Sequence, residues 1–307
     1  MGLGLLGRGL ADVAFLAECG AQLTVTDLKS KDDLAPTLKK LKKYKNIRYV
    51  LGEHRLEDFS DCDMVIKAAG VPLDSSFIAH ARSLNIPIEM DESLFAKCAP
   101  DVRIIGITGT RGKTTTTMLI YSMLLEAKKT RRYKGDVFLG GNILGLATLP
   151  LLKKVKPGDT MVLELSSWQL QGFGEAHISP HIAVFTNFLD DHLNYYNGDR
   201  SLYWNDKAYI FSSQSGGDFF VAPKELLKKV QSQYPDVRSH FVVPLSVPSS
   251  WNLKIKGAHN HQSVVLAIAV GGVLGITDDT MKKAVEQFSA VEGRLEHVAT
   301  IQDIEIY

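Results

Sequence analysis

The sequence predicts an α/β protein built on mostly parallel sheets. Short runs rich in β-branched residues recur along the chain, segments with helical apolar spacing lie between them, and several of the runs are apolar throughout, as in sheets covered by helices. The predicted strands are 22–27, 63–68, 86–90, 102–108, 136–140, 160–166, 181–187, 218–222 and 240–245. The predicted helices are 8–19, 34–44, 75–84, 112–127, 200–212, 260–274 and 278–288.

Length and composition limit the class of protein. At 307 residues the chain is long enough for two domains with their own cores. Its 45% hydrophobic and 22% charged residues are ordinary for a soluble globular protein. Thirty-five basic and 34 acidic residues give a net charge near +1, which argues against a dedicated nucleic-acid or membrane-surface binder.

Cysteine usage and the apolar segments indicate where the protein works. Cys19, Cys62 and Cys98 are too few and too scattered for a disulfide framework or a zinc site. No charged-then-apolar segment opens the chain, and the longest apolar run, 264–276, is too short to span a bilayer. We therefore expect a cytoplasmic protein with no membrane partner.

Two changes of pattern predict the domain boundaries. A proline between a helical stretch and a new strand places the first boundary near residue 99, and a second change comes near residue 292. The predicted domains are 1–98, 99–291 and 292–307. The last begins with two predicted strands and stops there, so we expect it to be the opening of a third domain whose remainder is absent.

A glycine-rich segment, GITGTRGKTTTT from Gly106, predicts a phosphate site. A strand precedes it and a helical pattern follows it, which is the context that a phosphate-binding loop requires. Backbone N–H groups of the turn and of the helix N-terminus would bind the anion, Lys113 would contact the outer phosphates, and the Thr114 hydroxyl would hold Mg²⁺. The standard loop needs a glycine where this chain has Ile107. The alternative is a glycine turn that only packs closely.

A second glycine pattern opens the chain. Gly2, Gly4 and Gly7, with Asp27 twenty residues after the last of them, satisfy the dinucleotide fingerprint of a Rossmann-like domain. Taken alone, this pattern indicates an NAD-dependent oxidoreductase. The strand that normally precedes the turn is missing, because the chain begins at Met1.

Three further polar residues have both a structural and a functional interpretation. Glu164 ends a predicted strand, where it could bind a metal or form a cap or salt bridge. His192 follows Asp190 and Asp191 just past another strand end, where ligands collect in α/β sheets. Lys207 lies fifteen residues after His192 in a predicted helix, and on sequence alone it is a surface lysine.

Six motifs in order resemble the Mur ligase superfamily. The form G-x-T-G-T-x-G-K-T, with its extra residue, is the superfamily's phosphate loop, and the segment from Gly106 to Thr114 matches it at every fixed position. The other motifs are GGN at 140–142, ELSSWQL at 164–170, TNFLDDHL at 186–193, GAHN at 257–260 and GRLE at 293–296. ELSSWQL in particular resembles the members that add D-glutamate to UDP-N-acetylmuramoyl-L-alanine.

The resemblance implies a reaction and its partners. It implies an ATP-dependent amide ligase of peptidoglycan precursor synthesis, working as a monomer, with UDP-N-acetylmuramoyl-L-alanine and D-glutamate as partners and an acyl phosphate as intermediate. It also implies a Rossmann-like UDP-binding domain, a central ATPase-like domain and a third Rossmann-like domain that is largely absent. The alternatives are a Mur-type ligase for another amino acid, a nucleotide-binding fragment without turnover, and the NAD-dependent oxidoreductase.

The resemblance also implies roles for particular residues. Those implied for ATP are Gly109, Thr110, Arg111, Gly112, Lys113, Thr114, Thr115, Asn260 and Arg294. Those implied for the UDP substrate are Leu5, Leu6, Gly7, Asp27, Asn142 and Ser166, with Asn142 also at the acyl phosphate. Glu164, His192 and Thr114 would hold Mg²⁺ together with Lys207, which the superfamily uses as a carbamate formed with CO₂.

Overall fold

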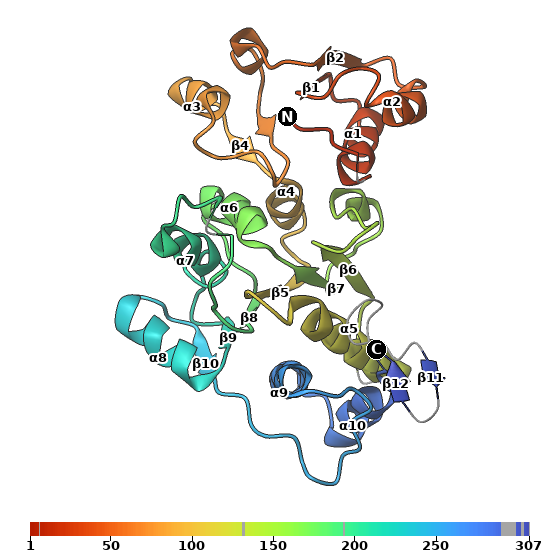
Figure 1. Cartoon of the computed structure of the whole chain (residues 1–307), viewed down its shortest axis with the longest axis vertical. Helices are drawn as coiled ribbons and strands as arrows, with labels where there is room; N and C mark the ends of the chain where they lie inside the picture. The colour runs from red at the N-terminus through yellow and green to blue at the C-terminus, as the bar shows by residue number, and fades with distance from the viewer. Residues whose placement is uncertain (6, 131–132, 193, 290–298, 302–303, 307) are drawn as a thin grey trace. The chain divides into compact units, whose positions relative to one another are not determined.

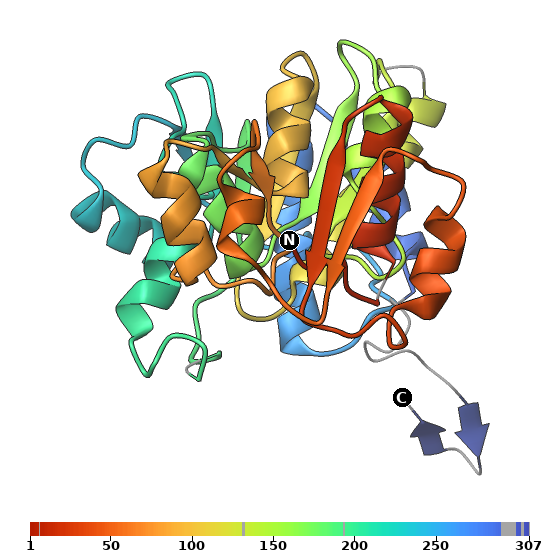
Figure 2. The same ribbon diagram turned by 90° about the horizontal axis from the view of Figure 1, so that it is seen from above.

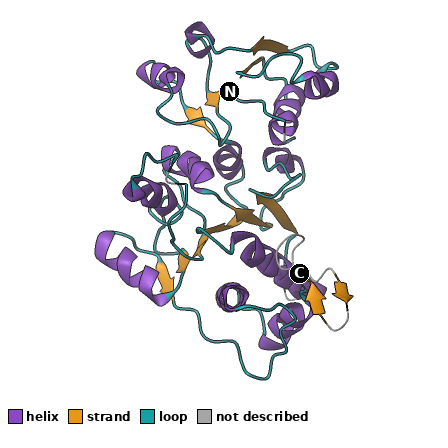
Figure 3. Cartoon of the chain, in the orientation of Figure 1, coloured by secondary structure: helices purple, strands orange, loops and turns teal. Residues whose placement is uncertain are grey.

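The computed structural model of the chain describes residues 1–5, 7–130, 133–192, 194–289, 299–301 and 304–306. Helices and strands alternate along the chain (Figure 3), and the predicted α/β class with mostly parallel sheets is confirmed. The chain divides into two compact units. The first comprises residues 1–100, 140–155 and 168–177, and the second comprises residues 101–139, 156–167 and 178–307.

A six-stranded sheet forms the centre of the second unit (Figure 1), in the order β10-β9-β8-β5-β7-β6. Its strands are β5 (Arg103–Thr108), β6 (Val137–Gly141), β7 (Thr160–Glu164), β8 (Ile182–Phe185), β9 (Phe219–Val221) and β10 (His240–Val242). β5 pairs in parallel with both β7 and β8, and β9 pairs in parallel with β8 and β10. Because parallel strands end at the same edge, the segments after β5, β7 and β8 collect there.

Helices pack on this sheet through apolar faces. They are α5 (Lys113–Lys129), α7 (Arg200–Ala208), α8 (Lys224–Gln233), α9 (Ala258–Val273) and α10 (Asp278–Gln287). Leu119 and Met123 of α5 share one core with Val264 of α9 and with Ile105 and Ile107 of β5. Every residue of β7 and β8 is buried, which explains the apolar runs 161–163 and 182–185 within them.

The first unit contains two pairs of parallel strands. β1 (Leu23–Asp27) pairs with β2 (Ile47–Leu51), shown side by side in Figure 2, and β3 (Val65–Ile66) pairs with β4 (Ile88–Glu89). The Gly2 amide donates to the Thr26 carbonyl at 2.8 Å, and the Met1 amine donates to the Ile66 carbonyl at 2.8 Å. Met1 and Gly2 therefore lie between the two strand pairs. In a Rossmann-like domain, the end of the central strand occupies this position.

Short helices complete the first unit. The α-helices are α1 (Arg8–Glu18), α2 (Ala35–Leu41), α3 (Ser76–Ser83), α4 (Asp91–Cys98) and α6 (Ser167–Glu175), and the 3₁₀ helices are η1 (Leu56–Phe59) and η2 (Leu149–Lys153). Among the described residues, no helix combines the length and the apolar composition needed to cross a bilayer.

Six of the helices and strands were not predicted from the sequence: β2, α4, α6, α8 and the 3₁₀ helices η1 and η2. Gly172 and Gly174 lower the helix propensity of α6. The structure shows why a glycine is needed at the first of them, since a Cβ at Gly172 would stand 2.8 Å from Met90 Cβ. α8 buries Leu227 and Val230, whose helical spacing in the sequence is consistent with this helix.

The end of the chain forms two strands, as predicted. β11 (Ala299–Ile301) pairs antiparallel with β12 (Ile304–Ile306). The predicted boundary near residue 292 lies outside the described residues, and the assignment of 292–307 to a third domain stays a prediction.

Three buried carboxyl groups meet in the first unit. Asp12 lies on α1, and Asp91 and Glu92 begin α4. Burial, followed by the charge of Asp91, raises the pKa of Asp12 to about 8. Burial also raises the pKa of Glu92 well above its usual range, although Arg8 lies 3.8 Å away and opposes this. The cluster therefore holds protons that an unfolded chain would release.

We expect the free energy of unfolding of this unit to fall as the pH rises from about 4 to about 8. The unfolded Asp12 carboxyl ionises at about pH 3.9, whereas the folded one keeps its proton until about pH 8, so the unfolded state binds fewer protons over this range. Asp12→Asn, which cannot ionise, should raise the melting temperature more at about pH 8 than at about pH 4. Thermal unfolding followed by circular dichroism is the measurement, with the exposed Asp32→Asn as the control. An equal shift at both pH values would contradict a buried, protonated Asp12.

Candidate active site

The glycine-rich loop that we predict to bind phosphate lies between β5 and α5, and its placement between a strand and a helix is confirmed. β5 ends at Thr108, and α5 begins at Lys113 after Gly112, whose backbone is left-handed with φ of 79°. No side chain caps the N-terminus of α5. Its first amides and the positive end of the helix dipole therefore remain suited to an anion.

Gly109 occupies a position that no other residue could take. Its φ is 141°, and a Cβ added there would stand 1.9 Å from the Thr186 hydroxyl oxygen. The segment after β8 thus contacts the bare backbone of the loop.

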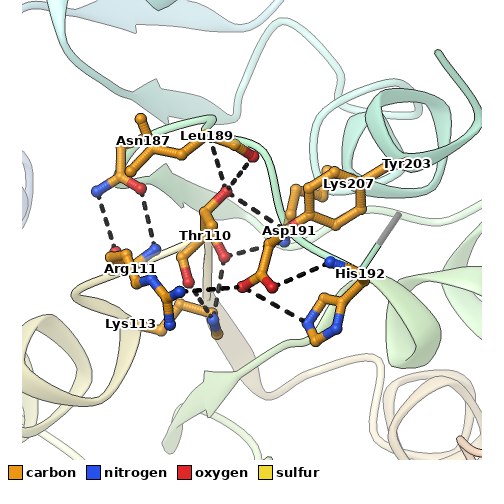
Figure 4. Close-up of polar contacts among 10 residues, drawn as sticks. Thr110, Arg111, Lys113, Asn187, Leu189, Asp191, His192, Tyr203 and Lys207 are labelled. Atoms are coloured by element: carbon orange, nitrogen blue, oxygen red, sulfur yellow. Dashed lines mark hydrogen bonds and ion pairs between the residues drawn. The ribbon is translucent and has the colours of Figure 1, made fainter. Parts of the chain in front are cut away.

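The same segment anchors the rest of the loop (Figure 4). The Thr110 amide donates to the Asn187 carbonyl at 2.9 Å, and the Arg111 amide donates to Asn187 Oδ1 at 2.9 Å. In return, Asn187 Nδ2 donates to the Arg111 carbonyl at 3.1 Å. These bonds hold the loop in shape.

Two lysines converge on one backbone oxygen of the loop. Lys113 Nζ donates to the Gly109 carbonyl at 3.0 Å, and Lys207 Nζ of α7 donates to the same carbonyl at 2.9 Å. Lys207 is only 1% exposed, so it is not the surface lysine that its sequence context alone indicates. Burial, followed by the charge of Lys113, holds the pKa of Lys207 well below its usual range, although Asp191 and Asp206 oppose this. Lys207 therefore loses its proton at a lower pH than an ordinary lysine does.

An acidic group ends one of the two strands that flank β5, and an imidazole group follows the other. Glu164 ends β7, 3% exposed, and it pairs in register with Ile107 of β5. His192 has a left-handed backbone with φ of 55°, and its Nε2 lies 3.9 Å from Asp191 Oδ2. The guanidinium of Arg111 lies 3.7 Å from the same oxygen. Asp191 therefore links the loop arginine with His192.

Residues of α9 approach the loop from another direction. A Cβ at Gly112 would stand 3.2 Å from Ser263 Oγ, and Gln262 Nε2 donates to the Thr186 carbonyl at 2.9 Å. Asn260 is buried and donates to the Lys256 carbonyl at 2.8 Å. The predicted role of Asn260 at ATP stays a prediction.

The donor set fits a divalent cation that is bound together with phosphate. Magnesium favours one or two carboxylates completed by hydroxyl groups, waters and substrate phosphates. Glu164 and the half-buried Thr114 at the start of α5 supply such oxygens. No group of three or more His, Cys, Asp and Glu side chains arranged for a metal occurs among the residues that the structure describes. Further ligands would have to come from phosphate or from another side chain.

The glycine turn of the first unit is held by Asp27. Its two carboxylate oxygens accept the Gly4 and Lys29 amides, both at 2.8 Å. Leu5 is exposed, and Gly7 has a left-handed backbone with φ of 88° before α1. The turn thus presents backbone at the start of a helix, as the fingerprint predicts.

For the remaining predicted site residues the structure gives a position, and their roles stay predictions. Asn142 follows β6 and belongs to a segment of the first unit, and Ser166 follows β7. Thr115 is buried in the first turn of α5. Leu6 and Arg294 lie outside the described residues. Asn187 and Tyr203 contact the loop but were not predicted as site residues. Tyr203 lies four residues before Lys207 on one helix, and this spacing could have indicated that Tyr203 faces the same site.

Comparison with known proteins decides the family. Residues 107–247 match the Mur ligase middle domain, and residues 1–89 match the N-terminal domain of MurD-like Mur ligases. A UDP-N-acetylmuramoylalanine–D-glutamate ligase of Roseiflexus sp. is 34% identical over 99% of this chain and 70% of the relative. The chain belongs to the Mur ligase family.

Other relatives agree with this Mur ligase assignment. A ligase of the same name from Borreliella burgdorferi is 33% identical over the whole chain and 69% of the relative. A crystal structure of a UDP-N-acetylmuramate:L-alanyl-gamma-D-glutamyl-meso-diaminopimelate ligase from Neisseria meningitides superposes with a TM-score of 0.60. That likeness covers 94% of this chain and 97% of the other at 16% identity, so it shows the fold alone.

Proposed function

We propose that this Mur ligase forms an amide between UDP-N-acetylmuramoyl-L-alanine and D-glutamate at the expense of ATP. The relatives described above are named for this reaction, and they match nearly the whole chain. ATP would phosphorylate the carboxylate of the UDP-sugar substrate, and the amine of D-glutamate would then displace phosphate from the acyl phosphate. The proposal takes the reaction to occur in the cytoplasm, with a monomer as the working unit.

The proposed mechanism rests on one observation: Lys113 and Lys207 both donate to the Gly109 carbonyl. Both lysine nitrogens lie within hydrogen-bond distance of one oxygen, and burial together with the charge of Lys113 lowers the pKa of Lys207. Lys113 can turn from the loop carbonyls to the outer phosphates of ATP. There it would stabilise the charge that builds on the transferred phosphoryl group.

In its uncharged form, which the lowered pKa favours, Lys207 is suited to reaction with CO₂. Its nitrogen would form a bond to the carbon of CO₂ and release one proton, which gives a carbamate anion. Glu164, His192, Thr114 and this carbamate are the residues that would hold Mg²⁺, and the ion would neutralise phosphate charge when bound. Asn142 would contact the reacting acyl group, and Ser166 and the glycine turn would contact the UDP substrate.

The partial reaction tests the proposal most directly. The chain is incubated with Mg-ATP and UDP-N-acetylmuramoyl-L-alanine, and hydroxylamine traps any acyl phosphate as a hydroxamate. We expect the hydroxamate together with ADP, and calorimetric binding of ATP and of the UDP-sugar but not of NAD. Binding of both ligands without hydroxamate would favour a nucleotide-binding protein without ligase chemistry. NAD binding alone would favour the oxidoreductase. Replacing D-glutamate by other amino acids in the complete reaction tests specificity.

Asp27→Ala should weaken binding of the UDP-sugar substrate and leave Mg-ATP binding unchanged. The expected cost is about 1.5–3 kcal/mol, the usual value of a hydrogen bond to a charged acceptor, and loosening of the Gly4 amide would add to it. Calorimetry with each ligand is the measurement, and the exposed Asp33→Ala is the control. Unchanged affinity for the UDP-sugar would remove Asp27 from the substrate site.

A further inference from the structure

Helix α7 presents two buried side chains to the phosphate loop. Tyr203 and Lys207 lie four residues apart and therefore on one face of the helix. Each is 1% exposed. Lys207 contacts the loop at Gly109, and Tyr203 contacts it at the next residue, Thr110.

The hydroxyl of Tyr203 completes the hydrogen bonds of Thr110. Thr110 Oγ1 donates its only proton to the Leu189 carbonyl at 3.1 Å and accepts the Leu189 amide at 2.9 Å. Tyr203 Oη lies 3.3 Å from Thr110 Oγ1, and it must be the donor because the threonine proton is already used. Tyr203 thereby ties helix α7 to the loop at Thr110, the residue that also bonds the segment after β8.

The ring of Tyr203 lies against the reactive end of Lys207. Lys207 Nζ is 4.8 Å from the ring centroid. Other rings enclose the tyrosine, with centroid distances of 5.3 Å to Phe188, 5.2 Å to Tyr196 and 6.0 Å to His192. Since these neighbours prevent the ring from turning away, it limits where Lys207 can point.

We propose that Tyr203 is a positioning residue with two separable ends: its hydroxyl fixes the phosphate loop for ATP, and its ring holds Lys207 in place for reaction with CO₂. The ring end rests on the carbamate role proposed above, whereas the hydroxyl end requires only that the loop binds nucleotide. A flat carbamate would meet the flat face of the ring, so the contact made by the amine would persist after the reaction.

Two substitutions separate the ends. Tyr203→Phe removes only the hydroxyl, and we expect Mg-ATP to bind about three- to tenfold more weakly, as loss of one neutral hydrogen bond implies, with carbamate formation unchanged. Tyr203→Leu removes both ends, and we expect the same weakening together with about fivefold less carbamate. Calorimetry measures nucleotide binding. Nuclear magnetic resonance with isotope-labelled bicarbonate measures the carbamate, whose signal is assigned by its absence in Lys207→Ala.

Tyr133→Phe is the matched control, because it also deletes a phenol–threonine hydrogen bond, the 2.6 Å contact with Thr160, in the same unit. It should leave both measurements at the wild-type level. Tyr203→Met serves in place of the leucine variant if that variant does not fold.

The outcomes distinguish this inference from the proposed function. If the wild type forms no carbamate and binds no Mg-ATP, the proposed function fails. If the wild type does both and Tyr203→Phe binds Mg-ATP as tightly as Tyr133→Phe does, the hydroxyl end is wrong. If Tyr203→Leu forms as much carbamate as the wild type, the ring end is wrong. Equal loss of both measurements in Tyr203→Phe would indicate a general structural role and would overturn the inference.

Discussion

Lys113→Ala is expected to lower ATP consumption by about a hundredfold or more, the usual cost of removing one preorganised charge contact from a transition state. Lys113 Nζ donates to the carbonyls of Gly109 and Thr110, both at 3.0 Å, and is thus held over the loop that would receive the phosphates. Formation of ADP in the presence of UDP-N-acetylmuramoyl-L-alanine is the measurement.

Lys128→Ala, near the other end of α5, is the control for this variant. Lys128 is exposed and forms an ion pair with Asp136, away from the loop, so its removal should leave ADP formation unchanged. If Lys113→Ala retained turnover and ATP affinity, the segment from Gly106 to Thr114 would be only a structural turn.

Lys207→Ala is expected to lose activity by a similar factor, about a hundredfold or more, and to recover part of it when acetate is added. A small carboxylate can enter the space left by the side chain and supply the oxygen anion that the carbamate would provide to Mg²⁺. Rates of ADP formation with and without acetate are the measurement.

The state of Lys207 also predicts a pH dependence. Its lowered pKa leaves the amine uncharged at a lower pH than the ~10.4 of an ordinary lysine would allow. Activity should fall as the pH drops through this lowered value, because the protonated amine does not react with CO₂. Lys228→Ala on α8, an exposed lysine paired with Glu225, should show neither the loss nor the acetate effect. A fully active Lys207→Ala would disprove the carbamate role.

Much of the site could be predicted because its residues follow strand ends. The loop after β5, Glu164 at the end of β7 and His192 after β8 are each marked by an apolar run that stops at a polar residue. Parallel strands then bring these three places to one edge of a sheet without further information. The placement of Lys207 in a helix was likewise predicted, and its family role depended on the resemblance.

The remainder depends on contacts between residues far apart in the sequence. That Lys207 is buried follows from the packing of α7 against a loop about a hundred residues earlier, which no local pattern records. The bonds between Arg111 and Asn187 are of the same kind. Helix α6 was not predicted for the same reason. Gly172 lowers the helix propensity of this segment, and the glycine is needed because Met90, far away in the sequence, packs closely against it.

The bare backbone at Gly109 has a consequence for inhibitor resistance. A change at Gly109 itself is closed to the protein as a way to evade an inhibitor that contacts this glycine, since any Cβ there would collide with the Thr186 hydroxyl. Moving Thr186 aside would not open the position, because the Asn187 backbone nitrogen lies only 3.0 Å from the same Cβ. Escape by mutation at Gly109 would therefore destroy the loop that the inhibitor blocks.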